Sequence, residues 1–82
     1  MQILLRRHAG WIGRLASLDV LVNEQKVCSI ERNETKVITL PDDGGTLRVE
    51  MQSAVSSTSV RIEPENDGSL FECGSSWWVR FD

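Results

Sequence analysis

The chain has 82 residues, the size of one small domain, and its 40% hydrophobic and 26% charged residues are typical of a globular rather than a disordered protein. Its net charge of −3 argues against a nucleic-acid partner, because nucleic-acid-binding domains usually present a basic face. No stretch reaches the ~20 apolar residues of a membrane-spanning helix, so we expect no membrane insertion. After Met1, apolar residues precede basic ones, the reverse of a secretory signal, which favours a cytoplasmic location.

Short runs of alternating apolar and polar residues predict strands from the N-terminus onward. The first strand covers residues 3–7, and the segment 11–14 after it is expected to form a bend or bulge. Residues 17–22 and 26–30 predict a β-hairpin with a tight turn at residues 23–25. The side chains expected to point inward from this hairpin are those of Leu18, Val20, Val22, Cys28 and Ile30.

Strands and turns continue to alternate in the second half of the chain. A turn at residues 32–34 leads into a strand at 35–40, which Pro41 ends because proline cannot donate to a ladder. The run Asp42-Asp43-Gly44-Gly45 is the strongest turn signal. Further strands are expected at residues 46–51, 58–63, 70–73 and 77–81, separated by a polar connection at 52–57, a loop at 64–69 and a turn at 74–76. The residues expected to point inward are Ile38, Leu40, Leu47, Val49, Met51, Val60, Ile62, Phe71, Cys73, Trp77, Val79 and Phe81.

This pattern predicts a single all-β domain over residues 1–82. Its roughly seven or eight short strands with regular turn signals are typical of a small Ig-like β-sandwich or barrel. Parallel strands usually need a helical crossover, and no helical period is present, so we expect the sheets to be antiparallel. The apolar residues 3–5 are expected to lie in an edge strand that can pair across a dimer axis.

The central segment resembles a recurring bacterial pattern. It consists of Leu18-Asp19-Val20-Leu21-Val22-Asn23, Lys26-Val27, Asn33-Glu34-Thr35, Leu40-Pro41-Asp42-Asp43-Gly44-Gly45 and Thr46-Leu47-Arg48-Val49, and the later Phe71-Glu72-Cys73-Gly74-Ser75 fits as well. The pattern is similar to PEGA-type and related small uncharacterised bacterial β-domains. Glu24 and Asn33 stand where that pattern has glycine, and Thr46 stands near its usual histidine. The resemblance implies a small β-sandwich, often appended to larger envelope or membrane proteins, without known catalysis.

Few residues offer recognisable chemistry. His8 is the single histidine and lies beside Arg6 and Arg7, so it is the one candidate for a histidine-dependent catalytic group. Arg6, Arg7, His8 and Arg14 are expected to be solvated among mixed charges, or to form a modest anion-binding patch. Cys28 and Cys73 are interpreted as two small buried hydrophobic residues, and a disulfide between them, which would require export, is the alternative.

No bound cofactor or metal is predicted. The two cysteines and the histidine lack the close pairing of zinc ligands. The oxygen-rich groups Asp42-Asp43 and Glu65-Asn66-Asp67 fall in turns, where these residue types are common for local reasons. We therefore expect neither an enzyme nor a metalloprotein.

Three tryptophans are the most informative residues for function. Trp78 and Arg80 alternate with Trp77, so we expect the pair on the outer face of the last strand. Exposed tryptophan and arginine often anchor interfaces, and Trp11 is a further candidate. We interpret the chain as a non-catalytic interaction module, either protein-binding or self-associating as a homodimer. A carbohydrate- or cell-envelope-binding domain is the alternative.

Overall fold

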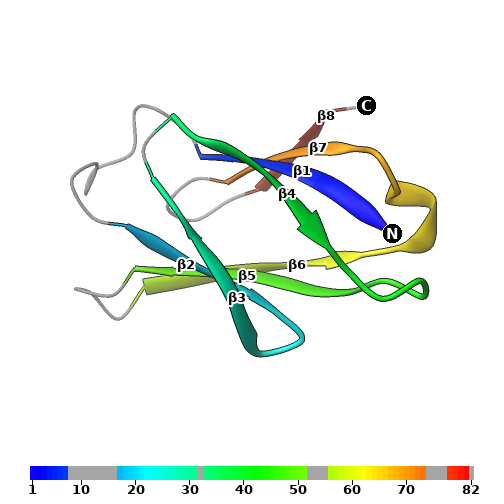
Figure 1. The fold of residues 1–82 in the computed structure, drawn as a ribbon, viewed down its shortest axis with the longest axis horizontal. Helices are drawn as coiled ribbons and strands as arrows, with labels where there is room; N and C mark the ends of the chain where they lie inside the picture. The colour runs from blue at the N-terminus through cyan, green and yellow to red at the C-terminus, as the bar shows by residue number, and fades with distance from the viewer. Residues whose placement is uncertain (8–16, 32, 52–55, 74–77, 82) are drawn as a thin grey trace.

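The computed structural model describes residues 1–7, 17–31, 33–51, 56–73 and 78–81, and these residues form strands joined by tight turns and one short 3₁₀ helix (Figure 1). The elements are β1 Gln2–Arg7, β2 Leu18–Val22, β3 Gln25–Ile30, β4 Thr35–Thr39, β5 Gly45–Met51, β6 Ser56–Ile62, the 3₁₀ helix η1 Pro64–Asn66, β7 Leu70–Cys73 and β8 Trp78–Phe81. The predicted strands are thus confirmed. Most strands differ from the prediction by one residue at one end, and the largest difference is at β6, where Ser56 and Ser57 belong to the strand rather than to the connection. The expected first residue of the last strand, Trp77, and the expected connection at residues 52–55 lie outside the described residues.

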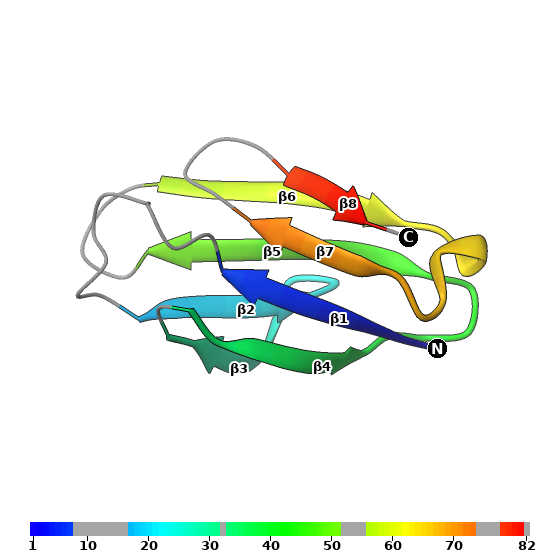
Figure 2. The ribbon, with the colours of Figure 1, turned by 90° about the horizontal axis from the view of Figure 1, so that it is seen from above.

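The strands form two four-stranded sheets that pack face to face, which confirms the predicted β-sandwich (Figure 2). Sheet A has the order β4-β1-β7-β8, and sheet B has the order β3-β2-β5-β6. The chain crosses from one sheet to the other between β3 and β4, so these two edge strands lie on the same side of the sandwich (Figure 2).

The expectation of purely antiparallel sheets is wrong at one pair of strands. β1 and β7 are parallel, with Leu5 opposite Phe71 and Arg7 opposite Cys73. A parallel pair needs a crossover connection, and here the strands of sheet B supply it instead of a helix. The same topology corrects the expected edge strand, since β1 lies between β4 and β7, and Leu4 and Leu5 are paired on both sides.

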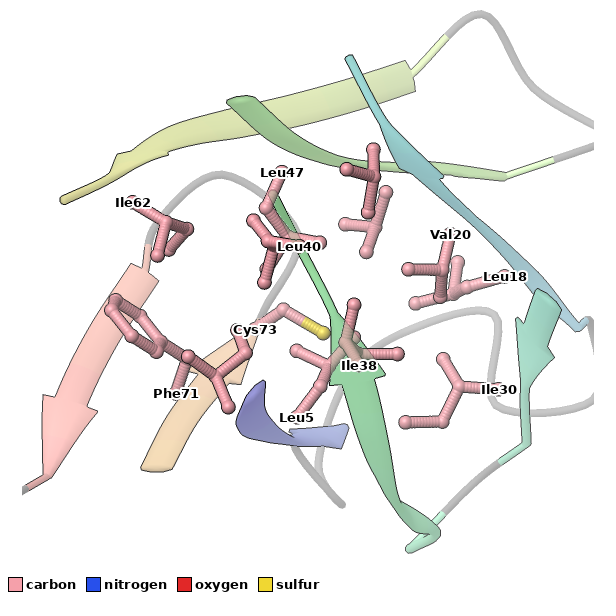
Figure 3. Close-up of a cluster of buried hydrophobic side chains, with 13 residues drawn as sticks. Leu5, Leu18, Val20, Ile30, Ile38, Leu40, Leu47, Ile62, Phe71 and Cys73 are labelled. Carbon is pink, nitrogen blue, oxygen red and sulfur yellow. The ribbon is translucent and has the colours of Figure 1, made fainter. Parts of the chain in front are cut away.

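The core lies between the two sheets and is formed by alternate residues of strands β1 to β7 (Figure 3). Residues predicted to point inward and found buried are Leu18, Val20, Val22, Ile30, Ile38, Leu40, Leu47, Val49, Ile62, Phe71 and Cys73. Ile3 and Leu5 of β1 join them, and Cys28 and Val60 are partly buried against the cluster. The inward prediction is therefore confirmed for these positions. The side chains of Met51, Trp77, Val79 and Phe81 lie outside the described residues.

The predicted turns at residues 23–25 and 42–45 are present, but each is one residue shorter than expected, because Gln25 belongs to β3 and Gly45 to β5. Asn23 and Glu24 both have positive φ angles, 51° and 70°, as a two-residue hairpin turn of the mirror-image type requires. Gly44 has a φ of 90°, and a Cβ atom there would stand 2.1 Å from the carbonyl oxygen of Ile62. Only glycine fits this position, because both its backbone angle and its surroundings exclude a side chain. The expected bend at residues 11–14 and turn at 74–76 lie outside the described residues.

Across the described parts of the chain, no helix is long and apolar enough to span a membrane.

Candidate functional site

The structure describes only part of the predicted site. Trp11 and His8 lie outside the described residues. Trp78 and Arg80 belong to β8, where the ladder sets them opposite Cys73 and Phe71, two residues whose own side chains are buried. The side chains of Trp78 and Arg80 are themselves outside the described residues. Paired residues share a face of a sheet, so the pairing of β7 with β8 does not support an exposed Trp78–Arg80 pair, which stays a prediction.

The expectation that the N-terminal basic residues are solvated is wrong for Arg7, and Arg6 and Arg7 do not form a common patch. His8 and Arg14 lie outside the described residues. Arg7 is the inward neighbour of Leu5 along the strand and is 1% exposed. Arg6 points to the other face, where its Nε donates to Glu72 Oε2 at 2.8 Å. The alternation of the strand separates the two guanidinium groups, since successive side chains point to opposite faces.

The outer face of sheet B is polar. Lys26 pairs with Asp19 at 3.2 Å, and Arg48 pairs with Glu24 at 2.9 Å and with Glu50 at 3.1 Å. One apolar side chain on this face, Leu21, is nevertheless buried, because the register places it between Lys26 and Arg48, whose aliphatic stems can cover it. This face has the mixed charge of an ordinary solvated surface.

The outer face of sheet A differs, because apolar side chains line up across its strands. Val37 of β4 stands opposite Leu4 of β1, and Leu4 stands opposite Leu70 of β7. Val37 is 57% exposed and Leu4 39% exposed, while Leu70 is half-buried. We call Val37, Leu4 and Leu70 the apolar row. It is the one place in the described part of the chain where exposed large hydrophobic side chains are cross-strand neighbours.

The apolar row begins at a free sheet edge. Among the strands that the structure describes, β4 has β1 as its only neighbour in sheet A. Met1 and Leu40 exchange both backbone hydrogen bonds, and the Arg7 N–H donates to the Glu34 carbonyl oxygen. Because bonded pairs alternate along an antiparallel ladder, the even-numbered residues between positions 34 and 40 bond to β1. The backbone groups of the odd-numbered residues of β4 therefore point away from the sheet, and these residues are Thr35, Val37 and Thr39.

The side chains of these three residues are all exposed, whereas Lys36 between them lies on the inner side. The Lys36 ammonium donates to the Ser29 carbonyl oxygen of β3 at 2.6 Å, which links the two edge strands across the open side of the sandwich. No charged side chain thus stands on the exposed face of β4 itself. An edge of this kind can pair with another strand.

The other two edges with described side chains are less suited to pairing. β3 carries a bulge opposite Val20 and Leu21, near the exposed Lys26 and Val27, and bulges and lysines are common protections of sheet edges. On the β6 edge, Ser59 and Arg61 are exposed and polar. β4 is therefore the edge whose chemistry most favours contact.

The two cysteines are free thiols with weak nucleophilic character. Burial raises the pKa of the Cys73 thiol to about 11, and burial also raises the pKa of Cys28 although Lys36 opposes it. A nucleophilic or metal-binding thiol needs a lowered pKa, so both groups are suited to packing. Among the described residues, no group of three or more histidine, cysteine, aspartate or glutamate side chains is placed to hold a metal ion.

Sequence reasoning missed the apolar row and the β4 edge. The alternation over residues 35–40 correctly implied that Val37 points outward, but it carries no information on which strand becomes the neighbour of Leu4. A single exposed valine is normal on a protein surface, and its alignment with Leu4 becomes visible only in the folded sheet.

Comparisons of this chain with protein families, with characterised proteins and with solved structures find no match.

Proposed function

We propose that this domain is a non-catalytic interaction module that contacts a protein partner through the β4 edge and the adjoining apolar row of sheet A. The observation that carries the proposal is Val37, which is 57% exposed, has its backbone groups on the free edge and is the first member of the apolar row. Edge backbone groups supply affinity to an added strand, and the side chains beside them supply selectivity.

Two further features support contact rather than chemistry. The raised pKa values of both thiols favour the protonated, unreactive form. In the described part of the chain, the outer face of sheet B carries charged pairs around Leu21, whereas the outer face of sheet A carries the apolar row beside the Arg6–Glu72 ion pair, and this difference favours sheet A for association. The resemblance to PEGA-type domains, which lack known catalysis, agrees with this proposal by analogy.

Site-specific photo-crosslinking tests the proposal. A benzophenone amino acid replaces Val37 in one variant and Ser59 in a matched control, because both positions are exposed and lie on free sheet edges. Ultraviolet illumination in the source cells should give a discrete protein adduct from position 37 and none from position 59. The absence of an adduct at position 37, or equal adducts at both positions, would overturn the proposal.

The alternative of a carbohydrate- or envelope-binding domain depends on Trp11, Trp78 and Arg80. No described side chain favours it, so it stays a prediction.

A further inference from the structure

We propose that the partner at this surface is a second copy of the chain, bound by antiparallel pairing of the two β4 edges about a two-fold axis through Val37. The inference rests on the proposed function and adds the identity and register of the partner. Such pairing would join the two copies of sheet A into one continuous sheet.

The backbone of β4 defines the register of this pairing. In an antiparallel ladder, two residues that exchange both of their hydrogen bonds must each direct their backbone groups toward the partner. Thr35, Val37 and Thr39 meet this condition. A two-fold axis at Val37 sets Val37 opposite its own copy and Thr35 opposite Thr39 of the second copy, so every outward group meets an outward group. If the register slipped by one residue, the outward backbone groups of one copy would lie opposite even-numbered residues of the other, whose backbone groups already bond to β1.

The exposed side chains of β4 are self-complementary in this register. Their order is threonine, valine, threonine, which is the same in both directions along the strand. Two-fold pairing therefore sets threonine against threonine and valine against valine, and such cross-strand pairs stabilise sheets. No charged residue occupies this face of β4, so no like charges meet. The two apolar rows become continuous across the axis, as an isologous interface requires.

The one charge of β4 is accommodated. An inward-pointing lysine in an edge strand can act as a protection against pairing. Here the Lys36 ammonium already bonds to the Ser29 carbonyl oxygen and lies 3.9 Å from Glu34 Oε1. In the proposed register, Lys36 faces Ile38 of the second copy, and Lys36 of the second copy is its diagonal neighbour on the same face. Each ammonium keeps its own acceptors, the Ser29 carbonyl oxygen and Glu34, which offset the repulsion between the two lysines.

The β6 edge provides the matched comparison. Asn23 and Thr46 are hydrogen-bonded to each other, which directs the even-numbered residues of β5 toward β2 and the odd-numbered ones toward β6. Through the register of β5 with β6, the outward backbone groups of β6 then include those of Ser59 and Arg61. This edge is free as well, but its outward side chains are polar, and water solvates them well.

Charge-swap variants of Val37 test the axis directly, with sedimentation velocity on the purified full chain from micromolar to millimolar concentration. The wild-type chain should form a dimer. Val37→Lys and Val37→Glu should each weaken that dimer by about tenfold or more, because like charges would face each other across the axis. An equimolar mixture of the two variants should restore a one-to-one dimer. Ser59→Lys and Ser59→Glu should leave the wild-type dimer unchanged.

A proline variant tests the backbone part of the proposal. Val37→Pro removes an outward N–H that the monomer does not use, and proline is tolerated at such edge positions, so the variant should fold and remain monomeric. Ser59→Pro is its control on β6. Circular dichroism verifies folding, and if Val37→Pro does not fold, the charge-swap mixture decides alone.

Several outcomes would overturn the inference. A wild-type chain that is monomeric throughout, a dimer that tolerates either charged variant, or a mixture that does not reassemble each contradicts a two-fold axis at Val37. If the chain is monomeric but position 37 crosslinks to another protein, the proposed function stands and only the second-copy partner is wrong. If the chain is monomeric and position 37 gives no adduct, both proposals are wrong.

Discussion

The turn between β2 and β3 contains a residue that is energetically unfavourable for its conformation. Glu24 has a φ of 70°, and a residue other than glycine in the left-handed region costs about 1–2 kcal/mol. Glycine would remove that cost, but its greater conformational entropy in the unfolded chain lowers the free energy of unfolding by about 0.4–1 kcal/mol. The change Glu24→Gly should therefore gain roughly 0.5–1 kcal/mol from the backbone alone.

The side chain of Glu24 also contributes, and a second variant separates the two effects. Glu24 pairs with Arg48 at 2.9 Å but is largely exposed, so this ion pair stabilises the fold by at most about 1 kcal/mol. When Glu24 is replaced, Arg48 retains its ion pair with Glu50 at 3.1 Å. Glu24→Gln removes the charge while the strained backbone remains. Glu24→Gly should thus be more stable than Glu24→Gln by about 0.5–1 kcal/mol.

Urea unfolding followed by tryptophan fluorescence measures this difference, with Asn23→Gly as the control in the same turn. Asn23 also has a positive φ, but its Oδ1 accepts the Thr46 N–H at 2.9 Å, so Asn23→Gly should lose about 1 kcal/mol. A Glu24→Gly protein that is less stable than Glu24→Gln would refute the reasoning, since relief of the backbone would then not outweigh the freedom of glycine.

Two further predictions concern the glycines and the buried thiol. Gly44→Ala should lower the melting temperature far more than Gly68→Ala. Both glycines have positive φ, but the new Cβ at position 44 would stand 2.1 Å from the carbonyl oxygen of Ile62, whereas the one at position 68 would meet no atom within 4 Å. Equal losses in thermal unfolding would contradict this reasoning. Burial raises the pKa of Cys73 from 9.0 to about 11, so its contribution to stability is complete below pH 9 and is lost as the pH rises toward 11. Urea unfolding at both ends of this window should show the loss in the wild-type chain, and a Cys73→Ala variant with the same pH dependence would contradict it.

The sequence by itself determined the strands and most of the inward residues of the described part of this protein. Alternation predicted which residues of β2, β4 and β5 are buried, since a strand with one face against a core must repeat every second residue. Glycine and proline marked the turn at residues 41–45 because they restrict or extend the backbone angles in a way that does not depend on distant contacts. These features are local, so local sequence is sufficient.

Only the tertiary structure decided which strands became neighbours and which became edges. Residues 3–5 looked like an edge strand, yet β1 lies in the middle of sheet A, and the free edge is β4. Arg7 looked like part of a basic surface, yet the alternation that buries Leu5 also buries Arg7. The parallel pairing of β1 with β7 joins residues more than sixty positions apart, as Leu4 and Leu70 show. Pairing of this kind depends on the combined burial of both sheets, because the backbone hydrogen bonds that join two strands are the same whichever strands they join.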